Sequence, residues 1–586
     1  MLDVLLRNVN VVDGTGNPGY RAAVGVKDGK IAVIARGSEV PDALRVIDCA
    51  GLVCAPGFID VHTHTEYSIL VHHHAVSTLH AGVTTEVMGM CGYGIFPVNE
   101  AISTEARARM AGMSQVDQAT VGEVDWTDLS GWLDKVEKHG VGINVLQFAG
   151  HGGIRAYVMG KEGKGGERVI PTADEMEAMK RTVAECMEQG AFGLSSGLQY
   201  APGRNAITSE IIELGRIVGQ YGGAYISHMR SEDEYLNFAA RELIEICRET
   251  GMRGSMTHHK AYGIENWGKV HATTALIDDA RSRGIQVMCD FYPWEYAAES
   301  NIGSTFYADF EQTPRNADEL IGKLKNEDAW SGLKAHLLEM QRREAEAMLA
   351  RSVALARYGI KSSAAPNHLD TSYIVHSRTH PEVIGLSERE AAKALGFGGD
   401  FLEAARKLHL DDDGYCYYAG GLIGEDDIRH LVKYPHAAIS TDSWTWERPP
   451  DLRRPGMSAH PRAYGSFAKT LGLYSRDLGL VRLEEAVRKM TSLPTSLLGL
   501  DDRGIVRPGL WADLTVFDPN RVANQATYAD PYRFPVGIEY VLVNGVLAID
   551  KGQETRALNG KVLRSRGSCG GRWDLTPGCR TPKVRS

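Results

Sequence analysis

The chain has 586 residues, a formal net charge of −10 at pH 7, 43% hydrophobic residues and 24% charged residues. These fractions exclude a disordered, collagen-like or fibrous protein, and the acidic balance argues against a protein that binds nucleic acid. No run of about 18 apolar residues occurs, which excludes a membrane span, and a length well above roughly 150 residues predicts several domains or one domain with insertions.

The two ends of the chain share one pattern of short β-type runs. Residues 1–55 contain several such runs, and residues 501–563 resume the same style. This arrangement predicts a small β-sandwich domain built from both termini. Residues 564–586 form a basic tail, which we expect to be solvated, as terminal segments commonly are.

Between the two ends, the sequence alternates between short apolar runs and helical stretches. Most of the apolar runs follow a helical stretch that stops at a glycine, the residue that commonly ends a helix. The runs lie at residues 57–64, 83–91, 142–148, 191–195, 223–228, 254–258, 285–290 and 437–442. Alternation predicts an α/β fold with a parallel sheet, and eight units predict a TIM-like (β/α)8 barrel over residues 56–500.

A long segment, residues 293–436, separates the seventh run from the eighth. Ordinary βα loops have about 2–6 residues. Helical patterns fill much of the segment, at residues 317–351, 386–395 and 400–408. We expect a helical insertion that acts as a lid or subdomain over the catalytic face. A contact surface in a homo-oligomer is the alternative, and the sequence leaves it open.

Residues that bind metals follow most of the predicted strands. His62 and His64 stand two positions apart at the end of the first strand, so both imidazoles point to one side. The others at strand ends are Cys91, His228, His258 or its neighbour His259, and Asp442. The carboxyl ends of barrel strands form one face, where we expect these side chains to meet. Histidine, cysteine and aspartate together are typical zinc ligands.

Several phrases of the sequence resemble one enzyme family. Pro56-Gly-Phe-Ile-Asp-Val-His-Thr-His64 resembles the opening motif of the amidohydrolase superfamily. Met90-Cys-Gly92, Ser227-His-Met-Arg230, Asn266-Trp-Gly268 and His460-Pro-Arg462 resemble its N-acyl-D-amino-acid deacylase (D-aminoacylase) branch. The resemblance covers roughly residues 1–290 and 430–550.

The resemblance implies a set of site residues. A tight zinc site would use Cys91, His228 and His258, and a weaker second site would use His62, His64 and Asp442. The resemblance favours His258 over His259. Many superfamily members bridge two metals with a lysine on the fourth strand, but residues 191–197 contain none, and Cys91 is the obvious substitute. The residues expected to bind substrate are Lys260, Tyr292, Arg230 and Arg462.

The implied function is zinc-dependent hydrolysis of a linear amide, most simply the deacylation of an N-acyl-D-amino acid. In that mechanism metal-bound hydroxide attacks the amide, and Asp442 accepts a proton and later returns it to the leaving nitrogen. The preference for D-amino acids rests on the resemblance alone. The expected partner is a small-molecule substrate, with no nucleic acid and no membrane.

Two other functions stay open at this stage. A cyclic-amide hydrolase of the hydantoinase or dihydropyrimidinase kind is disfavoured by the missing lysine and by Cys91. A non-catalytic barrel that serves as a binding module is disfavoured because all six metal-ligand positions are filled.

Three further features of the sequence fit other interpretations. Gly193-Leu-Ser-Ser-Gly197 matches the nucleophile motif of serine hydrolases, but a loop-like stretch follows where that motif needs a helix. His72-His-His74 is interpreted as an exposed run. The nine cysteines are few and odd in number, with no Cys-x-x-Cys pair, and the N-terminus lacks a signal-peptide pattern. These features predict a reduced, cytoplasmic protein.

Overall fold

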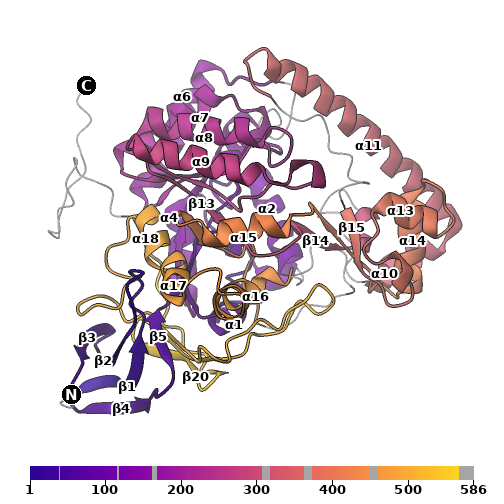
Figure 1. Cartoon of the computed structure of the whole chain (residues 1–586). Helices are drawn as coiled ribbons and strands as arrows, with labels where there is room; N and C mark the ends of the chain where they lie inside the picture. The colour runs from indigo at the N-terminus through magenta and orange to yellow at the C-terminus, as the bar shows by residue number, and fades with distance from the viewer. Residues whose placement is uncertain are drawn as a thin grey trace.

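The computed structural model describes residues 1–37, 40–114, 116, 118–160, 168–306, 317–361, 372–447, 453 and 460–565. It is an α/β protein in which parallel strands are covered by helices, with a β-rich region at one end and an extension at the other (Figure 1). Most of the expected basic tail, residues 566–586, lies outside the described residues. In the part of the chain described, no helix is both long and apolar enough to cross a membrane.

Two parallel sheets carry the expected strands. The first has the order β6-β7-β8 and the second the order β17-β13-β12-β11-β10-β9. Their bounds are β6 (Phe58–Asp60), β7 (Val83–Met88), β8 (Asn144–Gln147), β9 (Ala149–Gly150), β10 (Gly193–Gly197), β11 (Ala224–His228), β12 (Arg253–Met256), β13 (Val287–Phe291) and β17 (Ala437–Ile439). Each of the eight predicted runs overlaps one of these strands, and the short strand β9 directly follows the third run.

Backbone hydrogen bonds continue between the two sheets at both edges. On one side, the Phe192 amide donates to the Gln147 carbonyl at 3.0 Å. On the other, the Asp442 amide donates to the His62 carbonyl at 3.0 Å. The ends of β6 and β17 therefore lie side by side, although about 380 residues separate them in sequence.

Helices follow the strands along the chain, and α6, α7, α8 and α9 pack consecutively against one another (Figure 1). The helices of this region are α1 (Val76–His80), α2 (Glu100–Met113), α3 (Gln118–Val121), α4 (Leu129–His139), α5 (His151–Met159), α6 (Ala173–Glu188), α7 (Thr208–Gln220), α8 (Leu236–Thr250), α9 (Lys269–Ser282), α15 (Glu425–Lys433), α16 (Arg462–Lys469), a π-helix (Thr470–Asp477), α17 (Leu483–Met490) and α18 (Ser492–Leu498).

Helix α6 shows why local sequence predicts such elements well. The Thr172 hydroxyl accepts from the Glu175 amide, and the Glu175 carboxylate accepts from the Thr172 amide. This reciprocal pair satisfies two backbone donors that the helix start would otherwise leave unpaired. The helix ends before Gly190, whose φ of 109° suits glycine.

The two ends of the chain form one nine-stranded sheet. Its order is β21-β20-β19-β18-β5-β1-β2-β3, with β4 paired to β1. The strands are β1 (Leu2–Val11), β2 (Tyr20–Lys27), β3 (Lys30–Ala35), β4 (Ala43–Asp48), β5 (Val53–Pro56), β18 (Leu514–Phe517), β19 (Ile538–Val543), β20 (Val546–Asp550) and β21 (Gln553–Glu554). The pairing of β5 with β18 joins the N- and C-terminal strands, and side chains from both ends, among them Leu6, Val24, Leu514 and Leu542, share one apolar core.

The insertion is not purely helical, so the expectation of a helical insertion needs correction. A three-stranded antiparallel sheet of order β14-β16-β15 stands among its helices. The predicted stretch 317–351 is two helices, because the Asn326 side chain caps a new helix start by accepting from the Ala329 amide at 2.9 Å. The elements are β14 (Ala298–Asn301), α10 (Ala317–Lys325), α11 (Glu327–Ala356), β15 (Ser372–His376), α13 (Glu388–Ala394), α14 (Phe401–Asp411) and β16 (Tyr417–Gly420).

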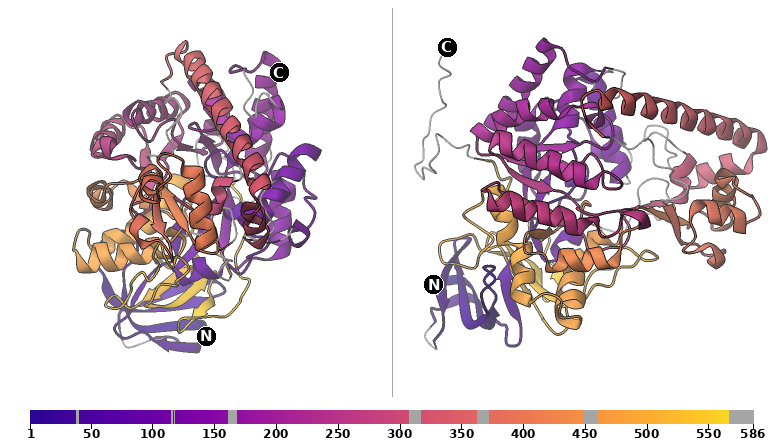
Figure 2. Two further views of the ribbon diagram at one scale, coloured as in Figure 1. Left: turned by 90° about the vertical axis from the view of Figure 1, so that its right-hand side faces the viewer. Right: turned by 45° about the horizontal axis from the view of Figure 1, so that its top comes forward.

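The insertion projects from the body of the protein and returns to it through α11 (Figure 2). Its helices have an apolar core of their own, which includes Phe306, Trp330 and Leu408. At the far end of α11, Leu355 and Ile360 pack against Val169 of the main body. The insertion is therefore anchored at two separate places.

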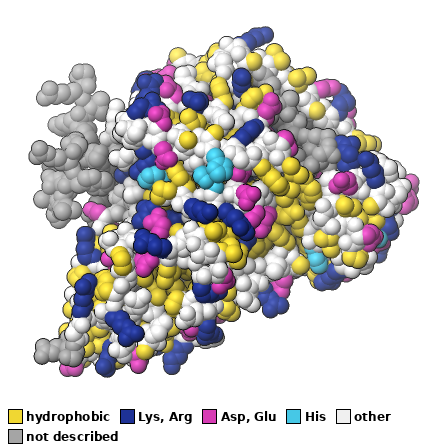
Figure 3. Space-filling view, in the orientation of Figure 1, with side chains coloured by type: hydrophobic (Ala, Val, Ile, Leu, Met, Phe, Trp, Pro, Cys, Tyr) yellow, Lys and Arg dark blue, Asp and Glu magenta, His cyan; other side chains and the backbone are white. Residues whose placement is uncertain are grey.

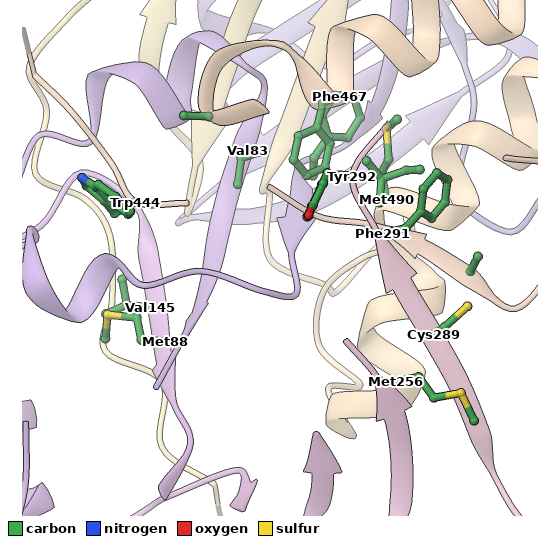
Figure 4. Close-up of a cluster of buried hydrophobic side chains, with 14 of the residues drawn as sticks. Val83, Met88, Val145, Met256, Cys289, Phe291, Tyr292, Trp444, Phe467 and Met490 are labelled. Atoms are coloured by element: carbon green, nitrogen blue, oxygen red, sulfur yellow. The ribbon is translucent and has the colours of Figure 1, made fainter. Parts of the chain in front are cut away.

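The main core lies between the parallel strands and the helices. Figure 4 shows part of it, where Phe291, Phe467 and Met490 gather near Tyr292. Phe58 of β6 stacks on Phe467 of α16 with ring centroids 5.7 Å apart. In contrast to this apolar core, the face seen in Figure 3 carries basic and acidic side chains that are interspersed.

Candidate metal centre

Four side chains from four different strand ends meet in one buried cluster. One potential ligand atom from each of His62, Cys91, His258 and Asp442 lies within 4.8 Å of those of the other three. The Cys91 sulfur is 3.3 Å from His62 Nε2 and 3.4 Å from His258 Nε2. Asp442 Oδ1 is 3.3 Å from His62 Nε2.

The other two predicted ligands border this cluster. His64 Nε2 lies 3.4 Å from Asp442 Oδ1, the same oxygen that faces His62. The His228 ring lies 4.5 Å from the His258 ring, and His228 Nε2 contacts Gln199 Oε1 at 2.7 Å. The structure thus brings all six predicted metal ligands together.

Three residues of the cluster have an unusual backbone conformation. The φ angles are 58° at Cys91, 34° at His258 and 48° at Asp442. A positive φ outside glycine costs about 1–3 kcal/mol and persists only where the surroundings enforce it. Here Asp290 accepts from the His258 amide at 2.9 Å, and Tyr200 donates to the Cys91 carbonyl at 2.9 Å. The surrounding structure therefore holds these three residues in a strained backbone conformation, in which their side chains point into the cluster.

The electrostatics of the cluster favour a cation. Burial would raise the pKa of the Cys91 thiol, but the neighbouring His62 and His258 rings hold it well below its usual value. Burial likewise disfavours charge on His62, yet Cys91 and Asp442 raise the pKa of His62 to about 10. A thiolate, imidazoles and a carboxylate at these separations fit a zinc-type ion, with a thiolate favouring zinc over magnesium or calcium.

Two buried carboxylates support the ligands, and our sequence interpretation missed both. Glu232 Oε1 is 2.8 Å from His258 Nδ1, and Asp290 Oδ1 is 3.6 Å from His62 Nδ1. A carboxylate bound to the second nitrogen of a ligating histidine orients its ring, a role that fits Glu232, whereas Asp290 is too far from His62 for a hydrogen bond and binds the His258 amide. Asp290 stands at the end of the seventh predicted strand. The criterion that selected the other residues, a metal-type side chain at a strand end, would have selected it too. Glu232 follows a strand by four residues and carried no such signal.

The structure separates the adjacent histidines 258 and 259. His259 points away from the cluster, with its Nε2 at 2.6 Å from the Thr273 hydroxyl on α9. Burial lowers the pKa of His259 to about 3, so the ring is neutral.

Substitution of the two histidines should therefore have different effects. We expect His258→Ala to lose bound metal. His259→Gln should keep the metal content of the unsubstituted protein, while losing about 1–3 kcal/mol of unfolding free energy for the Thr273 contact. Elemental analysis and urea denaturation measure the two quantities. Loss of metal from His259→Gln would contradict the assignment.

Three of the four predicted substrate-binding residues lie beside Asp442. Arg462 Nη1 is 2.9 Å from Asp442 Oδ2, and its guanidinium carbon is 4.6 Å from the centre of the Tyr292 ring. Lys260 Nζ lies 5.5 Å from the same ring centre and 2.9 Å from Glu232 Oε1. Two cationic side chains thus flank one tyrosine at the edge of the cluster.

Arg230, the fourth predicted substrate-binding residue, has another role in the structure. It is buried and forms a double contact with Glu242, at 2.9 Å from Nε to Oε2 and 2.8 Å from Nη2 to Oε1. It also donates to the Ala206 carbonyl at 2.8 Å. Arg230 binds Glu242 of α8 and backbone carbonyls, whereas Lys260 and Arg462 contact His258 and Asp442 of the cluster, so Arg230 is corrected from a substrate ligand to a structural residue.

A cavity of about 300 Å³ adjoins the cluster. Gly92 and Tyr93, which directly follow Cys91, form part of its wall, and Arg109 and Pro202 form another part. The Tyr93 ring stands 5.9 Å from the His64 ring. The cavity is therefore separated from the cluster by little more than one aromatic side chain.

Comparisons with known proteins identify the family of the chain. The Amidohydrolase family model matches residues 451–549. The chain is 31% identical over 570 residues to the N-acyl-D-glutamate deacylase of Alcaligenes xylosoxydans xylosoxydans, covering 97% of this chain and 98% of that protein. It is also 31% identical over 561 residues to the D-aminoacylase of the same organism, covering 96% of this chain and 97% of that protein.

A solved structure gives the same result for the fold. The N-acyl-D-glutamate deacylase of Bordetella bronchiseptica, complexed with zinc and a phosphonate inhibitor that mimics the tetrahedral intermediate, superposes with a TM-score of 0.70 at 29% identity. The match covers 96% of this chain and 99% of that one. With two relatives above 30% identity over nearly the whole length, the chain belongs to the N-acyl-D-amino-acid deacylase (D-aminoacylase) family of the amidohydrolase superfamily.

Proposed function

We propose that this protein is a zinc-dependent amide hydrolase that converts an N-acyl-D-amino acid to a carboxylate and a free D-amino acid. The observation that carries the proposal is the buried meeting of His62, Cys91, His258 and Asp442, with Arg462 on the other oxygen of Asp442. The zinc and phosphonate complex of the Bordetella deacylase supports both the metal and the reaction type.

The residues that would hold the metal are those of the cluster. Cys91, His258 and His228 would form a tight site, and His62, His64 and Asp442 a weaker second one. Zinc, when bound, supplies Lewis-acid polarisation of the amide carbonyl and lowers the pKa of a water molecule. Glu232 would hold the His258 ring in the orientation that binding requires.

Asp442 would move the proton. Burial raises its pKa, but Arg462 and His258 lower it well below the usual value, so the carboxylate is charged and can accept a proton. It takes the proton from the attacking water and gives it to the leaving nitrogen, acting as base and then as acid. Arg462 holds one carboxylate oxygen, which leaves the other directed at the cluster.

The substrate's carboxylate would bind beside Asp442, at Lys260, Tyr292 and Arg462. All three are buried, so a carboxylate bound there would meet the cations of Lys260 and Arg462 in a medium of low dielectric constant. An amide whose carboxylate is held at this point has its scissile bond over the cluster. This placement suits a linear N-acyl amino acid.

We further propose that the two parallel sheets are parts of one closed (β/α)8 barrel, with the hydrogen bonds at both seams as support. Residues 293–436 would act as a lid whose sheet begins at the site, since Tyr292 and Arg462 both donate to the Ala297 carbonyl. The seven described cysteines are all free and buried, which suits a reduced, cytoplasmic protein.

The test is a panel of substrates offered to zinc-loaded protein: N-acyl-D-amino acids, their L-enantiomers, and hydantoins. We expect hydrolysis of the D-compounds, abolished by a chelator and restored by zinc. Ring opening of hydantoins without deacylation would favour the cyclic-amide alternative. No turnover of any compound would favour the non-catalytic one.

Arg462→Lys tests the carboxylate site. The change keeps a positive charge near Asp442 but removes the two-pronged donor. We expect KM for an N-acyl-D-amino acid to rise about 10–100-fold, the equivalent of about 1.5–3 kcal/mol for a hydrogen bond to a charged group. KM for the neutral carboxamide of the same substrate should change little.

Arg230→Lys, at a buried arginine paired with Glu242, is the matched control and should leave both KM values unchanged. Equal KM increases for the acid and its carboxamide would contradict the assignment of Arg462.

A further inference from the structure

Three side chains outside the proposed catalytic site converge near the protein surface. They are His73 and His74, from the loop after the first strand, and Glu447, five residues beyond Asp442. One potential ligand atom from each lies within 4.8 Å of the other two. His73 Nδ1 is 3.8 Å from Glu447 Oε1, and the two imidazole rings are 4.3 Å apart.

The two imidazoles have unsatisfied polar atoms. Nδ1 of His73 and Nδ1 of His74 are each buried and have no hydrogen-bond partner among the residues that the structure describes. A buried polar group without a partner costs about 1–3 kcal/mol, so two such atoms beside a carboxylate need an explanation.

We propose that His73, His74 and Glu447 form a second, peripheral binding site for a divalent zinc-type ion, separate from the catalytic cluster. Two imidazole nitrogens and a carboxylate oxygen suit zinc, copper or nickel rather than magnesium or calcium. Bonds of about 2.1 Å place tetrahedral ligands roughly 3.4 Å apart, so the three side chains must draw together slightly on binding.

The open space beside Glu447 gives an ion access to this carboxylate and has room for water ligands. A surface cavity of about 320 Å³ borders Glu447 and is lined also by Val71, His72 and Arg556. Arg556 and His139 face His73 as well, with the His139 ring 4.7 Å away. Because Arg556 is positive, it weakens the attraction for a cation and limits the affinity of the site.

A bound ion would join two segments that the proposed mechanism depends on. The segment after Asp442 already contacts the loop after His64: the His74 amide donates to Glu447 Oε1 at 2.9 Å. The Ser77 amide donates to the Trp446 carbonyl at 2.9 Å, and the Trp446 amide to the Ser77 hydroxyl at 2.9 Å. A bound ion would add one more link between these two segments. This role does not depend on the proposed activity.

The experiment counts zinc in the full-length protein. Holoprotein is dialysed to equilibrium against increasing concentrations of Zn²⁺, and bound zinc is measured by elemental analysis. We expect the double variant His73→Ala/His74→Ala to bind one zinc per chain less than the unsubstituted protein. Zn²⁺ should also raise the Tm of the unsubstituted protein more than that of the double variant. His336→Ala, an exposed histidine on α11, is the control and should bind as much zinc as the unsubstituted protein.

Two milder variants keep the test decisive if the double variant does not fold. Glu447→Gln keeps an oxygen to accept from the His74 amide but removes the charge, and should weaken binding by about 10-fold or more. Arg556→Gln should tighten it, because a positive neighbour is removed. Identical zinc content in all variants, or filling only above millimolar Zn²⁺, would overturn the proposal.

Discussion

Asp442→Asn is expected to reduce kcat by about 10²–10⁴-fold, the range of a general acid–base contribution, while zinc stays bound. Asparagine matches aspartate in shape and, like aspartate, tolerates the left-handed backbone that this position adopts at φ 48°. The residues proposed for the tight site, Cys91, His228 and His258, are unchanged in this variant. Steady-state kinetics and zinc analysis on the same sample separate the loss of the proton acceptor from the loss of metal.

The control for this variant is Asp427→Asn. Asp427 is also a buried carboxylate, but it lies on α15 and accepts from the Gly268 amide. We expect its substitution to lower stability and to leave kcat within a factor of a few. Full activity in Asp442→Asn would remove Asp442 as the proton acceptor, and loss of zinc would make it chiefly a ligand.

Cys91→Ala is expected to have the largest effect on metal binding. The thiolate is the softest donor of the cluster and the one most selective for zinc. Removing it should weaken zinc affinity by more than about 100-fold, the upper end of the effect of removing a supporting partner. Competition with a chromophoric chelator measures the affinity, and activity should fall in proportion to the lost zinc.

Cys186→Ala is the matched control for Cys91→Ala. Cys186 is buried in α6, where burial raises its pKa to about 12, so it is a neutral thiol. Zinc content and activity should be unchanged by its substitution. Unchanged zinc affinity in Cys91→Ala would leave the histidines and Asp442 as the complete ligand set.

The strands and helices of the main body could be predicted because their causes are local. The eight apolar runs overlap strands, and the reciprocal Thr172–Glu175 pair fixes the start of α6 within four residues of sequence. The insertion was predicted less well. Strands β15 and β16 are four or five residues long and pair across about 40 residues of intervening chain, so no local pattern marks them.

The pairing of strands from the two chain ends also depends on contacts between residues that are far apart in sequence. The β pattern at each end was visible, but the pairing of β5 with β18 joins residues about 460 positions apart. Which strands of the two ends become neighbours in the sheet depends on which edges meet. That choice is made by long-range hydrogen bonds and not by the alternation within any strand.

Arg230 and Asp290 show the same limit within the site. An arginine next to a predicted ligand is equally consistent with a substrate contact and with an ion pair, and Glu242 on α8 decides for the ion pair. Asp290 was part of a predicted strand, but its role depends on its position opposite His62 and beneath the His258 amide. Partners that come from other elements decide the role of each residue.

The sequence by itself determined the class of fold, because the alternation of apolar runs and helical stretches is local. It also determined the ligand-type residues, because strand ends share one face and the His62–His64 spacing directs both rings to one side. Only the tertiary structure decided which of His258 and His259 joins the cluster. The positive φ at His258, enforced by the Asp290 side chain, turns that ring toward Cys91, while Thr273 on α9 holds His259 on the opposite side. Side-chain direction at a strand end depends on the neighbours that constrain the backbone, and those neighbours come from distant parts of the chain.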